Sequence, residues 1–145
     1  MFLNQYHHSF DDKGRLTIPA KFRELSDEGL YVVQGLDRNL MVLPPAIFDK
    51  LYSHLMEMNL TDPAARQLRQ IMLSNAQQVY PDGSGRILVP VNLRALAELK
   101  EEVVFVGQGD HYDIWSAEVW QKQQALLNDP ETSAQRFTAL DLSLR

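Results

Sequence analysis

The sequence contains no cysteine, which excludes a disulfide framework, a cysteine nucleophile and thiolate metal ligands. It has no apolar run of the roughly 18 residues that cross a membrane, and residues 1–9 lack a basic stretch followed by an apolar one. We therefore expect neither a membrane span nor export, and the missing cysteine fits a reducing cytoplasm. Of the 145 residues, 45% are hydrophobic and 23% are charged, which is typical of one compact globular domain or two small repeats.

Basic residues are fewer than acidic ones, 14 against 19, and the net charge is −5. The sum alone argues against a nucleic-acid partner. However, residues 1–94 carry ten Lys and Arg against ten Asp and Glu, whereas residues 95–145 carry four against nine. A local basic cluster in the first two thirds can therefore bind an anion, if the acidic last third faces elsewhere.

The chain contains an internal repeat. Residues 11–25 match residues 82–96 at a constant offset of 71, with six of fifteen positions identical. The match resumes at an offset of 72, where Gly35 aligns with Gly107, and one inserted loop residue explains the change. We infer two copies of one unit.

Each unit is predicted to run strand, turn, strand, short helix, strand, strand. The turns are placed at residues 11–14 and 82–85, because Asp accepts local backbone hydrogen bonds and Gly tolerates positive φ. Pro19 and Pro90 are predicted at the first position of the short helices. Two hairpins are predicted, one joining residues 31–33 to 40–43 and one joining 103–106 to 112–115.

Further helices are predicted between and after the repeats. An apolar stripe predicts a helix over residues 45–58, and Asp62 and Ser116 are predicted to cap the next two helices. Asp129 and Pro130 are interpreted as a break before a polar stretch and a less ordered tail. The boundaries are placed as follows: first repeat 5–47, connecting helices 48–75, second repeat 76–119, and C-terminal helical segment with tail 120–145.

The pattern Asp-x-x-Gly-Arg-x-x-Ile-Pro-x-x-x-Arg at residues 11–23 resembles the core of AbrB/SpoVT-type swapped-hairpin DNA-binding domains. Two such units in a chain of this length resemble the MraZ family of bacterial transcription regulators. The resemblance implies an α+β fold in which duplicated swapped-hairpin units form one pseudo-dimeric β-barrel with peripheral helices. It also implies a homo-oligomeric ring of several subunits in the cytoplasm, associated with the nucleoid. The expected targets are repeated sites upstream of the gene cluster for cell division and cell-wall synthesis, which includes the protein's own gene.

The first turn and the short helix after it supply the basic residues expected to bind double-stranded DNA. Four of them fall within eleven positions: Lys13, Arg15, Lys21 and Arg23. Arg15 is expected to read base edges, because its planar fork matches guanine O6 and N7, and the other three to contact phosphates. The second copy has Ser84 and Asn92 in place of the two lysines, so Arg86 and Arg94 are its only candidates and its contact with DNA is in question. Asp11, Gly14, Asp82 and Gly85 are expected to shape the turns.

Other functions have weaker support in the sequence. His7 and His8 precede Asp11 and Asp12, but adjacent strand residues point to opposite faces and no spaced third histidine follows. We expect no metal, no cofactor, no small-molecule substrate and no enzymatic activity. Two alternatives stay open, an antitoxin-like module that binds another protein and a small hydrolase with an unrecognised site.

Overall fold

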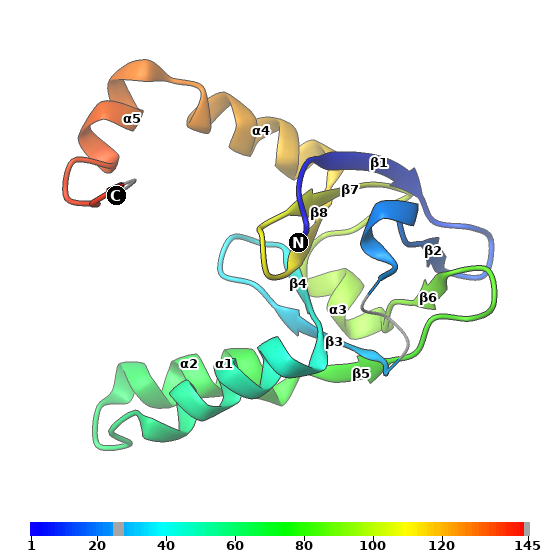
Figure 1. Ribbon diagram of the computed structural model, residues 1–145, viewed down its shortest axis with the longest axis horizontal. Coiled ribbons are helices and arrows are strands. Elements are labelled where there is room, and N and C mark those ends of the chain that lie inside the picture. The colour runs from blue at the N-terminus through cyan, green and yellow to red at the C-terminus, as the bar shows by residue number, and fades with distance from the viewer. Residues whose placement is uncertain (25–27, 144–145) are drawn as a thin grey trace.

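A computed structural model describes residues 1–24 and 28–143 of the chain. The fold is α+β, with a central antiparallel sheet and a separate two-stranded ribbon (Figure 1). The six strands of the sheet lie in the order β1 (Gln5–Ser9), β7 (Glu102–Gly107), β8 (Tyr112–Ser116), β4 (Leu40–Leu43), β3 (Leu30–Gln34) and β5 (Gln77–Val79). The ribbon pairs β2 (Arg15–Thr17) with β6 (Arg86–Leu88).

Helices lie on both sides of this framework (Figure 1). They are the 3₁₀ helix η1 (Ala20–Phe22) and the α-helices α1 (Pro45–Glu57), α2 (Pro63–Ser74), α3 (Val91–Leu96), α4 (Ala117–Leu127) and α5 (Pro130–Arg136). In Figure 1 the ribbon is at one side of the molecule, while α1 with α2 and α4 with α5 extend to the other side.

The two repeats exchange strands. β1 of the first repeat pairs with β7 of the second, and β5 of the second pairs with β3 of the first. Where the copies meet, equivalent residues face each other: Leu16 opposes Ile87 in the ribbon, and Met41 opposes Asp113 in the sheet. These pairs are 71 and 72 residues apart, the same offsets that define the repeat in the sequence. The register therefore fits two duplicated units related by a local two-fold axis.

The structure does not confirm a closed barrel. β1 and β5 are the edges of the six-stranded sheet, and within residues 1–24 and 28–143 the ribbon is a separate sheet. β2 and β6 are three residues long, and the chain reaches Pro19 and Pro90 soon after each of them. Proline has no N–H group to continue a ladder of hydrogen bonds. β2 and β6 therefore pair with each other, and the ribbon that they form does not extend onto the six-stranded sheet.

The main core lies between the sheet and the ribbon and takes residues from both repeats. Leu16 and Ile87 point into it from the ribbon, Phe22 from η1 and Leu93 from α3, and each is at most 1% exposed. Tyr112 stacks on Phe22 with 4.8 Å between ring centroids. Because each repeat supplies half of this core, neither has a complete apolar interior alone.

The other face of the sheet is covered by two sets of helices. α1 and α2 pack on β3 and β4, where the rings of Tyr31 and Phe48 stack at 4.0 Å. α4 packs on β7 and β8, where the ring centroids of Trp115 and Trp120 are 5.2 Å apart. The outer helices thus bury the second side of the sheet and leave the ribbon free of helical cover.

Most of the predicted elements are confirmed. Both hairpins form, the helix expected over 45–58 is α1, and the carboxylate of Asp62 accepts the Ala64 N–H at 2.9 Å. Ser116 caps α4 through the Val119 N–H. Leu25, which closes the first copy of the repeat, lies outside the described residues.

One local prediction was wrong. Pro19 and Pro90 have extended backbone, with ψ of 139° and 142°, and stand one residue before the helices as N-caps. The break at Asp129 and Pro130 is present between α4 and α5, and the polar stretch after it forms the helix α5, because the Asp129 carboxylate accepts the Glu131 N–H and Pro130 fits its first turn.

Separating the repeats should abolish the fold. We expect fragments 1–75 and 76–145 each to lack a cooperative thermal transition as monomers, because each exposes unpaired strands and half of the shared core. Mixing them should restore the transition, as measured by circular dichroism during heating. A monomeric fragment 1–75 that melts cooperatively would contradict the shared core.

Candidate nucleic-acid interface

The turn before β2 is built on one carboxylate. Oδ1 of Asp11 accepts the backbone N–H groups of Lys13 and Arg15, both at 2.9 Å, and Oδ2 accepts the Nε–H of Arg15 at 2.7 Å. Gly14 closes the turn with φ of +75°, and its N–H donates to the Asp11 carbonyl. Only glycine takes this conformation without strain. Asp11 and Gly14 therefore both take part in the turn at residues 11–14.

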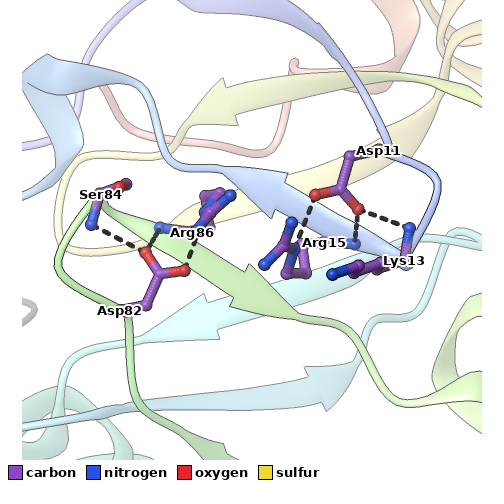
Figure 2. Close-up of polar contacts among 6 residues, drawn as sticks. All are labelled: Asp11, Lys13, Arg15, Asp82, Ser84 and Arg86. Atoms are coloured by element: carbon purple, nitrogen blue, oxygen red, sulfur yellow. Dashed lines mark hydrogen bonds and ion pairs between the residues drawn. The ribbon is translucent and has the colours of Figure 1, made fainter.

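The turn before β6 repeats this arrangement in the second copy, as Figure 2 shows. Oδ1 of Asp82 accepts the N–H groups of Ser84 and Arg86, and Oδ2 accepts the Nε–H of Arg86 at 2.8 Å. Gly85 has φ of +77°. The two turns therefore hold Arg15 and Arg86 in the same way, and this pairing leaves the two terminal guanidinium nitrogens of each arginine without an acceptor among the described residues.

Both aspartates stay ionised well into acid. Hydrogen bonds from the backbone N–H of Arg15 lower the pKa of Asp11 most strongly, and those from the N–H of Arg86 do the same for the pKa of Asp82. A carboxylate with a lowered pKa loses its contribution only as the pH falls through that lowered value. At neutral pH each turn therefore has a charged carboxylate that accepts the hydrogen bonds from its arginine.

The ribbon has one buried and one open face. Opposed residues of an antiparallel pair point to the same side, and neighbours along a strand point to opposite sides. Leu16 and Ile87 point into the core, so Arg15, Thr17, Arg86 and Leu88 share the outer face. Leu88 is 60% exposed there. The outer face of the ribbon, defined by these four residues, brings the two predicted arginines together.

The predicted lysines lie nearby but differ between the copies. Lys13 is exposed in the first turn and Lys21 is exposed on η1. Ser84 is exposed at the position equivalent to Lys13. Asn92 donates to Asn75 at the end of α2, so the residue that replaces Lys21 is tied to the connecting helices. The first copy is thus the more basic of the two.

Arg23 and Arg94 are not part of the outer face. Arg23 donates its Nε–H to the carbonyl of Ile18 and lies against Gly85, in the turn of the other repeat. Arg94 lies against Gly14 and over the ring of Phe10. The structure therefore places these two predicted site residues against the turns, each on the glycine that precedes Arg86 or Arg15.

Thr17 and Leu88 were missed as members of the interface. Both follow an arginine by two positions, and strand periodicity alone places such residues on one face. What the sequence does not show is that the two strands pair with each other, which puts all four side chains on a single surface.

Two other kinds of site find no support in residues 1–24 and 28–143. Within them, no three His, Asp or Glu side chains are close enough to share a metal ion. Over the same residues, no helix has the length and apolar character needed to cross a membrane.

Comparison with known proteins identifies the family. The family model described as "MraZ protein, putative antitoxin-like" matches residues 1–71 and again residues 72–142. The chain is 41% identical over 121 residues to a transcriptional regulator MraZ from Roseiflexus castenholzii, covering 83% of this chain and 85% of the relative. It is 42% identical over 121 residues to the regulator of that name from Herpetosiphon aurantiacus, with the same coverage.

A third relative matches from end to end. The transcriptional regulator MraZ of Leuconostoc mesenteroides is 36% identical over 143 residues, which is 98% of this chain and 100% of the relative. The repeated family match, these identities and the exchanged strands lead to one conclusion: the chain belongs to the MraZ family.

Proposed function

We propose that the protein is a transcriptional regulator that binds double-stranded DNA in a sequence-specific manner, through the outer face of the β2–β6 ribbon. The observation that carries the proposal is the pair of arginines, Arg15 and Arg86, held by aspartates on one open surface. The names of the relatives support a role in transcription. No catalytic role, cofactor or small-molecule substrate is part of the proposal.

The dimensions of the ribbon suit the major groove, which admits a two-stranded β-ribbon. Arg15 and Arg86 are diagonal neighbours, since each faces a residue two positions from the other arginine. Such neighbours are about 7–8 Å apart, close to two base-pair steps of roughly 3.4 Å. Each arginine has its Nε engaged by an aspartate and its terminal nitrogens available for guanine O6 and N7.

The basic residues around the ribbon are proposed to bind phosphates. Lys13 and Lys21 are exposed on the first copy only, so the first turn is proposed to contribute more to binding than the second. Arg15 is the main reader and Arg86 the secondary one. The proposed targets are repeated sites upstream of the cell-division and cell-wall gene cluster, including the protein's own gene, which places the protein at the nucleoid.

We further propose that the active form is a homo-oligomeric ring. Apolar side chains are exposed on both helical pairs, among them Tyr52 and Ile71 on α1 and α2 and Leu126 and Phe137 near α4 and α5. α5 buries none of its own residues. Both pairs extend away from the ribbon (Figure 1), so subunits joined through them keep every ribbon free. Several linked ribbons raise the effective concentration at repeated sites.

The proposal predicts specific, salt-dependent binding to the DNA directly upstream of the protein's gene. We expect a preference over a scrambled sequence at every salt concentration, with affinity falling steeply as salt rises because phosphate contacts release counterions. Titration by fluorescence anisotropy from low to physiological salt measures both quantities. Absence of binding at low salt would refute the proposal and favour the antitoxin-like protein partner.

The two arginines give a matched pair of variants. Arg15→Ala is expected to lower the affinity for the upstream DNA by roughly 10- to 100-fold, in line with the loss of one bidentate base contact. Arg86→Ala, which removes the equivalent pair in the second turn, is expected to cost less. The same anisotropy assay measures both, and thermal melting confirms that the variants fold. A folded Arg15→Ala protein with unchanged affinity would show that Arg15 is not the reader.

The ring predicts a dependence on the spacing of the sites. Identical ribbons on one face of an assembly meet sites that recur about every 10 base pairs on one side of the duplex. Inserting about 5 base pairs between two sites turns the second site away, and affinity should fall sharply. Gel-shift titration of the two DNAs, together with the mass of the free protein from light scattering, checks this. Equal affinity for both spacings would exclude the proposed avidity.

A further inference from the structure

Each turn of the proposed interface is covered by an arginine from the other repeat. A methyl group built on Gly14 would approach Nη1 of Arg94 to 3.2 Å and the central guanidinium carbon to 3.5 Å. A methyl group on Gly85 would approach Nε of Arg23 to 2.7 Å and its guanidinium carbon to 2.9 Å. The positive φ favours glycine at both places, and the packed arginine leaves no room for a methyl group at Gly85 and little room at Gly14.

The two contacts lie at equivalent places in the two repeats, although Gly14 meets the terminal nitrogens of Arg94 and Gly85 meets the Nε and Cδ of Arg23. Arg23 and Arg94 are 71 residues apart, and so are Gly14 and Gly85. The packing thus follows the same local two-fold axis as the strands. Each repeat supplies the cover for the turn that it does not contain.

Arg94 packs against the chain on either side of the first turn. Its Nε is buried and has no hydrogen-bond partner among the described residues, and its guanidinium carbon lies 5.4 Å from the centre of the Phe10 ring. Phe10 directly precedes the Asp11 turn, so the guanidinium contacts the chain on both sides of that turn. No carboxylate within the described parts of the chain is paired with Arg94 at 4.0 Å or less.

We propose that Arg94 and Arg23 are positioning residues, each of which fixes the DNA-reading turn of the opposite repeat. A guanidinium packed against the glycine of a turn hinders the turn from opening and limits the access of water to its hydrogen bonds with aspartate. The terminal nitrogens of Arg15 then occupy one place before DNA arrives, which lowers the ordering cost of binding. The effect on DNA binding rests on the proposed function, whereas the packing of Arg94 and Arg23 on the turns does not depend on it.

Amide hydrogen exchange in the full chain without DNA tests the positioning directly. In Arg94→Lys, which keeps the charge and the long stem but lacks the planar fork, we expect the Gly14 and Arg15 amides to exchange at least about threefold faster. The Gly85 and Arg86 amides should be unchanged. Arg23→Lys should give the reverse pattern, and Arg136→Lys on α5 should change neither turn. Arg94→Ala, compared with Arg94→Lys, should affect the first turn more strongly.

Binding to the upstream DNA supplies the second readout. A positioning role predicts that Arg94→Lys lowers the preference over scrambled DNA by about fivefold, and that Arg94→Ala, which removes the charge, leaves the salt slope unchanged. Lys13→Ala, a phosphate contact, should instead reduce the salt slope by about one.

The outcomes separate the two proposals. Faster exchange confined to the turn of the opposite repeat supports positioning, even in a protein that binds no DNA, in which case only the proposed function fails. Unchanged Gly14 and Arg15 amides in both Arg94 variants would overturn the inference. A reduced salt slope with unchanged amides would make Arg94 a direct phosphate contact, which also overturns it.

Discussion

Pairing between the two repeats is the constraint on which the rest of this structure depends. β2 against β6 forms the ribbon, β1 against β7 and β5 against β3 extend the sheet, and the core lies between them. A short hairpin alone cannot bury its edges or its apolar face in water. Because each copy completes the other, the same pairing that makes the fold also brings Arg15 and Arg86 onto one surface.

In both turns of the interface, a few residues each have more than one structural role. One aspartate per turn accepts two backbone N–H groups and one guanidinium N–H, so the carboxylate both shapes the loop and orients the arginine. The arginine of the opposite repeat, Arg94 or Arg23, packs against the glycine of the turn. The two copies differ in the basic residues around this frame, where Lys13 and Lys21 are replaced by Ser84 and Asn92. A duplicated scaffold can therefore carry two unequal halves of a binding surface.

Sequence reasoning was strongest where local chemistry determines the structure. The Asp and Gly of each turn, the two hairpins and the Asp62 cap all depend on neighbours within a few residues. The C-terminal segment was predicted to be helical with a break at Asp129 and Pro130. The polar stretch after the break was not assigned a helix of its own, because no apolar stripe follows it, although Asp129 and Pro130 repeat the Asp62 and Pro63 signal. The placement of Arg23 and Arg94 could not be predicted from local pattern, since each contacts a turn about 60 to 80 residues away that only strand exchange brings near. The closed barrel came from resemblance and is not confirmed.

The central claim is that the outer face of the ribbon reads the major groove. Methylation interference tests it most directly, because methylation of guanine N7 blocks the major groove and methylation of adenine N3 blocks the minor groove. The account predicts interference at guanine N7 of two positions roughly two base pairs apart within each site. It also predicts that Arg15→Ala becomes insensitive to methylation at one of them. Interference at adenine N3 alone, or an unchanged guanine pattern in Arg15→Ala, would contradict it.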